Sequence, residues 1–246
     1  MVSKEGALKG RAAVMSGIAE LHYVLKNKMM GPHPEPLQVA VFATGCFWGT
    51  EKGFWRLPGV HTTATGYCNG YTPNPTYDEV CSGQTGHTEA VRVVYDPEAV
   101  SYVDLLRLFW QQHDPTQGMG QGNDRGSQYR SGVYPTTAEQ MALAEASKAA
   151  YEAKLGRPIT SDVAEGVHFF FAEDYHQQYL AKPGARPYCS AQPTGVQLPP
   201  LSEWAPPGVD PEGPLKPKLS EEFWREHGPT PTCTIGVPND PIQWPQ

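Results

Sequence analysis

The stretch Val39–Gly59, "VAVFATGCFWGTEKGFWRLPG", joins an apolar run to a segment rich in aromatic residues. The run "QVAVFA", which starts at Gln38, predicts a buried strand, and Gly45 allows a tight turn after it. Beyond the turn, apolar residues recur at nearly helical spacing until "LPG" ends the helix. These residues are Phe47, Trp48, Phe54, Trp55 and Leu57. Cys46 therefore stands where a strand gives way to a helix.

The following segments extend this unit with more strands and helices. "VHTTATGY" predicts a second strand, and "TEAVRVVYD" predicts a third by its strict alternation. One face of the third strand carries Glu89, Val91, Val93 and Tyr95. Ser101 and Asp104 then form a capping box ahead of an apolar stripe. Thr137 and Gln140 open another helix, which ends at Gly156.

The order of these elements predicts an α/β (α+β) fold. Short extended segments are expected in "GVYP", "PITSDVAE" and "VHFFFAE", and a helix in "AEDYHQQYLAK". The pattern favours a two-layer sandwich around a mixed sheet, built from split βαβ units of the ferredoxin-like type.

Composition divides the chain into three parts. Residues 1–36 resemble a leader segment, in which "GIAELHYVLKNKMMG" could form a short amphipathic helix before the prolines of "GPHPEP". Residues 37–198 form the main domain. Residues 199–246 are a Pro-rich C-terminal extension with twelve prolines and three of the six tryptophans. Disordered tails are poor in aromatic residues, so we expect this one to lie extended on the domain, with a short helix at "SEEFWREHG".

Charge and hydropathy exclude several classes of protein. The net charge of the 246 residues is −7, and no long run of Lys or Arg occurs, which disfavours a nucleic-acid or anionic-membrane surface. No apolar stretch approaches the roughly 18 residues that a membrane span needs. The N-terminus lacks the pattern of a secretory signal. We expect a soluble, monomeric, cytoplasmic protein, or an organellar one if a transit peptide has been removed.

The five cysteines are Cys46, Cys68, Cys81, Cys189 and Cys233. None forms a C-x-x-C motif, which disfavours a zinc knuckle and a thioredoxin-type redox pair. A thiol at a helix N-terminus favours the thiolate, so we expect a low pKa for Cys46. The glycines of "GCFWG" leave room for a reaction partner. The alternative is an inert cysteine packed in an aromatic core.

Two long polar loops carry further candidates, and loops of this length are usually functional. The first contains Tyr71, Tyr77 and His87 and leads to Glu89, which is a buried acid with a raised pKa, a salt-bridge partner, or a residue at the sheet rim. The second contains His113, Asp114, Asn123, Asp124, Tyr129 and Arg130. The two aspartates are typical turn formers. No cysteine or carboxylate stands at ligand spacing from a histidine, so no metal site is expected.

Four blocks occur in order at compatible spacing over residues 39–200: "GCFWG", "GYTPNPTYDEVCSGQTGHTEAVRVVYDP", "HDPTQGMGQGNDRGSQYRSGVYP" and "AEDYHQQYL". Together they resemble peptide methionine sulfoxide reductase of the A type. The resemblance implies that Cys46 is the nucleophile and that Phe47 and Trp48 form the pocket for the substrate methyl group. It implies that Glu89, Tyr77 and Tyr129 surround the sulfoxide oxygen, with Asp124 holding the site through hydrogen bonds.

The same resemblance implies reduction of methionine-S-sulfoxide, free or in peptides, for the repair of oxidised proteins. A sulfenic acid on Cys46 and an intramolecular disulfide would be the intermediates, thioredoxin would be the reductant, and no cofactor would take part. Cys189 is the expected resolving cysteine. Gln197 occupies the place of a second one, so Cys233 could supply that thiol. We expect Cys68 to be a loop thiol and Cys81 to be structural.

Two other classes of function remain open at this point. A cysteine hydrolase or acyltransferase would pair Cys46 with His87, His113 or His176 and form a thioester. A methionine-binding module would use Phe47 and Trp48 as a cage and would tolerate Cys46→Ala.

Overall fold

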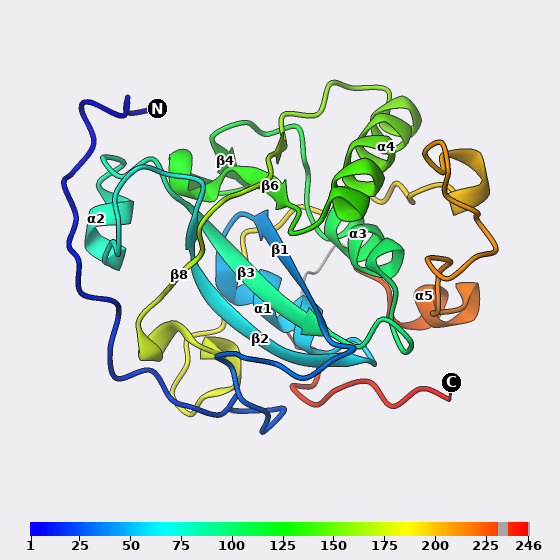
Figure 1. Ribbon diagram of the computed structural model, residues 1–246, viewed down its shortest axis with the longest axis horizontal. Helices are drawn as coiled ribbons and strands as arrows, with labels where there is room; N and C mark the ends of the chain where they lie inside the picture. Colours follow the sequence, from blue (N-terminus) through cyan, green and yellow to red (C-terminus); the bar gives the residue numbers. More distant parts are fainter. Residues whose placement is uncertain (231–235, 246) are drawn as a thin grey trace.

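The computed structural model describes residues 1–230 and 236–245. It is built around a six-stranded sheet, whose central strands β1, β3 and β2 lie side by side in Figure 1. The strand order is β7-β6-β1-β3-β2-β8. The strands are β1 Gln38–Thr44, β2 Val60–Cys68, β3 Thr88–Tyr95, β6 Ser131–Tyr134, β7 Asp162–Val163 and β8 Phe170–Phe171. A separate two-stranded ribbon pairs β4 Gly120–Gln121 with β5 Asp124–Arg125. The helices are α1 Phe47–Trp55, α2 Tyr77–Cys81, α3 Tyr102–Gln111, α4 Ala138–Leu155 and α5 Glu221–His227.

The centre of the sheet is a split βαβ unit, as predicted. β1 and β2 both pair with β3 in the antiparallel sense, so they run parallel to each other on either side of it. Helix α1 is the crossover between them. β6 is antiparallel to β1 and β7 is parallel to β6, which makes the sheet mixed. The predicted α/β fold with a mixed sheet is therefore confirmed.

One face of the sheet carries the main hydrophobic core. The alternating residues of β3 predicted to share a face are all buried, and Val91, Val93 and Tyr95 belong to the core cluster. Phe42 of β1 stacks on Phe54 of α1, with ring centroids 4.8 Å apart. This packing holds α1 against the sheet. The N-terminus of α1 thereby lies beside Glu89, near the start of β3.

The other face carries a smaller apolar cluster that includes Cys68 and Tyr134, and Val167 and Phe169 pack against it. Cys68 is the last residue of β2 and is fully buried. The expectation of a loop thiol was wrong, because the strand continues one residue beyond "VHTTATGY" and turns the side chain into this cluster.

Local capping signals in the sequence are reproduced. The Ser101 side chain accepts from the backbone of Asp104, and the Asp104 carboxylate accepts from the backbone of Ser101. Thr137 caps α4, and Gly156 ends it in the left-handed region at φ +70°. Helix α2, inside the first polar loop, was not predicted, although Thr76 and Glu79 form a capping box for it.

No helix forms in "GIAELHYVLKNKMMG", contrary to the expectation for the N-terminal segment. His22 is fully buried, and its Nε2 lies 2.9 Å from the Thr63 hydroxyl. Its Nδ1 accepts hydrogen bonds from the backbone of Val24 and Leu25. The His22 side chain thus stabilises a tight turn and holds the N-terminal segment against β2, and no helix forms there.

The helix predicted in "AEDYHQQYLAK" is also replaced, here by two short 3₁₀ turns, Asp174–His176 and Tyr179–Ala181. Gln178 separates them at φ +45°. Its side-chain and backbone nitrogens donate to the buried Glu51 carboxylate of α1, at 2.7 and 2.8 Å. The side-chain amide of Gln177 accepts from the backbone N–H of Thr65 at 2.9 Å and donates to the Thr65 carbonyl oxygen at 3.0 Å. These buried hydrogen bonds of Gln177 and Gln178 stabilise the two 3₁₀ turns in place of the α-helix that the apolar pattern predicts.

The C-terminal extension packs on the same core as the rest of the domain. Helix α5 forms where a short helix was predicted, and Phe223 and Trp224 are buried on it. The Asp104 carboxylate at the cap of α3 also accepts from the backbone of Lys218 at 2.8 Å. Over residues 1–230 and 236–245, no helix is long and apolar enough to cross a bilayer.

Candidate active site

A cleft of about 360 Å³ opens beside Cys46 at the N-terminus of α1. All seven residues that the sequence placed around one reaction centre line it: Cys46, Phe47, Trp48, Tyr77, Glu89, Asp124 and Tyr129. Tyr179, Arg186 and Tyr188 complete the wall. These residues come from α1, α2, β3, β5 and loops far apart in the sequence, and the split βαβ unit brings them together.

Cys46 is the N-cap residue of α1. The backbone N–H groups of Trp48 and Gly49 favour its thiolate, but burial and the nearby charge of Glu89 oppose this and hold the pKa of the thiol well above its usual range. The expectation of a low pKa was therefore wrong. Amide donors at a helix N-terminus favour a thiolate, but here desolvation outweighs them.

Glu89 is a buried acid, with 1% of its surface exposed. Its Oε2 accepts a hydrogen bond from the backbone N–H of Phe47 at 2.9 Å. Burial, with a smaller contribution from Asp124, raises its pKa to about 8, although the Phe47 hydrogen bond acts in the opposite direction. At neutral pH the carboxyl group is therefore mostly protonated and can donate a proton into the cleft.

Two phenols accompany this acid. Burial and the neighbouring Glu89 raise the pKa of both Tyr77 and Tyr129. Both hydroxyls stay protonated and can donate hydrogen bonds. Tyr77 is positioned at the start of α2, where its backbone N–H donates to Glu173 at 2.8 Å. The exposed Cys81 lies at the end of the same helix.

The apolar wall of the cleft is a cluster of aromatic rings. Trp48 stacks on Tyr179 with centroids 3.9 Å apart, and Phe47 lies 5.0 Å from the ring of His176. The Trp48 Nε1–H donates to His176 Nδ1 at 3.1 Å. Burial, followed by the charge of Lys182, lowers the pKa of His176 to about 4, so this ring is neutral and acts as an acceptor.

The histidines do not make a cysteine–histidine pair. His113 contacts the Phe109 carbonyl and the Ser131 hydroxyl with its two nitrogens. The acceptor nitrogen of His176 is occupied by Trp48. Among the residues that the structure describes, no histidine hydrogen-bonds the Cys46 thiol.

Asp124 contacts the chain on both sides of Cys189. Tyr188 and Ser190 each donate a hydroxyl hydrogen bond to it, both at 2.5 Å and to different carboxylate oxygens. Cys189 is disulfide-bonded, whereas Cys46, Cys68 and Cys81 are free thiols. Cys233, the other predicted relay thiol, lies outside the described residues.

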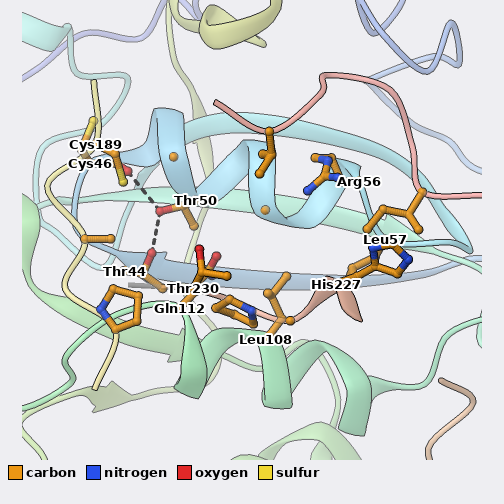
Figure 2. Close-up of a pocket in the computed structure, with 18 of the residues that line it drawn as sticks. Thr44, Cys46, Thr50, Arg56, Leu57, Leu108, Gln112, Cys189, His227 and Thr230 are labelled. Atoms are coloured by element: carbon orange, nitrogen blue, oxygen red, sulfur yellow. Dashed lines mark hydrogen bonds between the residues drawn. The ribbon is translucent and has the colours of Figure 1, made fainter. Parts of the chain in front are cut away.

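Behind Cys46, a second cavity of about 180 Å³ lies between α1, α3 and the C-terminal extension. Figure 2 shows Cys46 and Cys189 together at one end of it, with Arg56 and Leu57 at the other. Thr230 and Val237 of the extension also line it. Within residues 1–230 and 236–245, no group of His, Cys, Asp and Glu side chains could hold a metal ion.

Sequence reasoning missed four contributors to the site: His176 as a ring of the wall, and Tyr179, Arg186 and Tyr188 as lining residues. Arg186 is exposed at the rim, and its backbone N–H donates to the Tyr179 hydroxyl. Only Tyr188 offered a local signal, because it directly precedes Cys189. The other three come from the segment that was expected to form a helix and from the loop after it.

Comparisons with known proteins agree with this geometry. A family model described as peptide methionine sulfoxide reductase matches residues 38–198. The peptide methionine sulfoxide reductase MsrA of Azorhizobium caulinodans is 57% identical over 200 residues, covering 79% of this chain and 90% of that protein. The MsrA of Salinispora arenicola is 52% identical over 206 residues, with 81% and 92% coverage. The solved methionine sulfoxide reductase A of Corynebacterium diphtheriae superposes with a TM-score of 0.72 at 38% identity, covering 80% of this chain and 98% of its own. The chain therefore belongs to the peptide methionine sulfoxide reductase family, a family of oxidoreductases.

Proposed function

We propose that this chain reduces methionine-S-sulfoxide, free or in peptides, by transferring the sulfoxide oxygen to Cys46. The observation that carries the proposal is the meeting in one cleft of a thiol, a protonated carboxyl group and two protonated phenols. A sulfoxide needs such donors, because its sulfur becomes electrophilic only when its oxygen is protonated or strongly hydrogen-bonded. Phe47 and Trp48 provide an apolar surface for the methyl group.

In the first step, the Cys46 sulfur attacks the sulfoxide sulfur while Glu89 gives its proton to the oxygen. The thiol proton of Cys46 returns to Glu89, and Tyr77 and Tyr129 stabilise the charge on the oxygen. The attack gives an adduct in which a new sulfur–sulfur bond joins Cys46 to the substrate. This bond and the sulfur–oxygen bond of the substrate then break, and the hydroxyl group passes to the Cys46 sulfur. Overall, a thiol and a sulfoxide become a sulfenic acid and methionine. Because the pKa of Cys46 is raised, the thiol is protonated at neutral pH, and it must lose its proton as its sulfur attacks.

In the second step, Cys189 condenses with the sulfenic acid to give a Cys46–Cys189 disulfide and water. We propose that Cys233 then attacks Cys189 and frees Cys46, and that thioredoxin reduces the resulting disulfide. Two observations support this relay. Cys46 and Cys189 line one cavity, and so do Thr230 and Val237, two described residues that flank Cys233 in the sequence.

The proposal is tested by mixing the reduced protein with one equivalent of methionine-S-sulfoxide and counting thiols by mass spectrometry. We expect one methionine per chain and the loss of two thiols, with no reaction in Cys46→Ser. Cys189→Ser should still form one methionine and leave a sulfenic acid that a 1,3-dione reagent traps. Thioredoxin-coupled turnover by Cys46→Ser would refute the proposal. A thioester, in place of a sulfenic acid, would favour the hydrolase class.

A further inference from the structure

The Asp124 carboxylate accepts a hydrogen bond from each of the two neighbours of Cys189 in the chain, Tyr188 and Ser190. Its Oδ1 accepts from the Tyr188 hydroxyl and its Oδ2 from the Ser190 hydroxyl, each at 2.5 Å. Hydrogen bonds of hydroxyls to a carboxylate are among the stronger ones in proteins. Both carboxylate oxygens therefore bind the segment that carries Cys189, although Asp124 also lines the cleft.

The turn around Asp124 forms a matching docking surface for the same segment. Gly122 has φ +58°, and a side chain there would come within 2.1 Å of the Ser190 carbonyl oxygen, so the backbones pass in close contact. Gln121 Oε1 accepts from the backbone N–H of Gln192 at 3.0 Å. The β4–β5 ribbon thus contacts three positions between residues 188 and 192, and we call this contact the Asp124 clamp.

The clamp also places the segment at the reaction centre. The Tyr188 ring meets Trp48 edge-on, with centroids 6.2 Å apart. Cys46 and Cys189 line the same cavity (Figure 2). The clamp holds residues 188 and 190 by their side chains. The rotamer of the Cys189 side chain then determines which other cysteine sulfur its own sulfur approaches.

We propose that Asp124 is a positioning residue for the resolving step: it holds Tyr188 and Ser190 so that Cys189 stays beside Cys46. The inference rests on the proposed function. The step it accelerates is the condensation of the Cys46 sulfenic acid with the Cys189 thiol, which forms the disulfide and releases water. Without the clamp, the segment must search for this geometry, and the sulfenic acid persists for longer.

The test compares two rate constants in a single turnover of the full chain, which is first reduced and then freed of reductant. Methionine formation reports oxygen transfer, and loss of reactivity toward a 1,3-dione reagent reports disulfide formation. For Ser190→Ala, we expect the ratio of the disulfide rate constant to the methionine rate constant to fall at least about tenfold, as for the loss of one hydrogen bond to a charged group. The double variant Tyr188→Phe/Ser190→Ala should fall further.

Ser190→Thr is the matched control, because it keeps the hydroxyl and should retain the ratio of the unaltered chain. A merely structural role would lower thermal stability or slow both steps without changing the ratio. An unchanged ratio in Ser190→Ala and in the double variant would overturn the inference, even if Asp124→Ala fails to fold. Absence of methionine from the unaltered chain would refute the proposed function, and the inference with it.

Discussion

Replacing the buried acid tests the chemistry most directly. Glu89→Gln keeps the size and one hydrogen-bond acceptor of the side chain but removes the acidic proton. General acids contribute roughly 10²- to 10⁴-fold to a rate, so we expect a loss of that order in the oxygen-transfer step at pH 7. The Phe47 backbone donor retains a partner in the amide oxygen, so the fold around α1 should persist.

The raised pKa of Glu89 sets the size of the effect. A carboxyl group with the ordinary pKa of 4.5 is protonated in about one molecule in 300 at pH 7, whereas a pKa of about 8 keeps about nine in ten protonated. Burial therefore supplies about 300 times more of the acid form at this pH. Above pH 8 the acid form falls about tenfold per unit, and the rate constant for methionine formation should fall with it.

The assay is rapid mixing of the reduced protein with methionine-S-sulfoxide between pH 6 and 10, with quenching and quantification of methionine. The pKa of the Cys46 thiol lies well above its usual range. A fall in the rate constant for methionine formation near pH 8, the alkaline limb of the pH profile, therefore reports the ionisation of the Glu89 carboxyl group. Glu51→Gln is the matched control. Glu51 is also buried, with a pKa raised by burial to about 7, but it bonds Gln178 and Thr63 outside the cleft.

Glu51→Gln should retain the alkaline limb, whereas Glu89→Gln should lose it. If the unaltered chain and Glu89→Gln show the same pH dependence and similar rates, Glu89 is not the proton donor, and the argument from its burial fails. If Glu51→Gln instead abolishes the fall in rate near pH 8, the group that titrates there is Glu51, and its assignment to Glu89 is wrong.

Three further predictions concern the wall, the extension and the buried network. Trp48→Phe removes the donor to His176 and leaves a buried acceptor unpaired, so the KM for methionine sulfoxide should rise about tenfold in steady-state assays. Phe223→Ala should lower the free energy of unfolding by about 3–5 kcal/mol in urea titrations, whereas the exposed Glu222→Ala should change it little. Glu51 has a folded pKa above its unfolded value of 4.5, so its contribution to stability is complete below pH 4.5 and is lost as the pH rises through about 7. Glu51→Gln should remove this loss, which is up to about 3 kcal/mol.

Elements with strong local signals follow from the sequence. The alternation of β3 and the capping box of Ser101 and Asp104 act within a few residues, and both appear in the structure as predicted. For Glu89, the place on the apolar face of the strand left a buried acid, a salt-bridge partner and a residue at the sheet rim all open, and the structure shows the buried acid. The helix expected over residues 172–182 failed, because Gln177 and Gln178 bind partners more than 100 residues away.

The sequence by itself determined the split βαβ core and the position of Cys46 at a strand-to-helix junction, and its resemblance to the reductase family implied the set of residues around Cys46. Only the tertiary structure decided the protonation of that set. A helix terminus alone favours a thiolate, but the desolvation that raises the pKa of Cys46 and Glu89 depends on everything packed around them. The tertiary structure also decided the contact of Asp124 with Tyr188 and Ser190. These two residues follow Asp124 by 64 and 66 positions in the chain, and no local sequence pattern relates them to it.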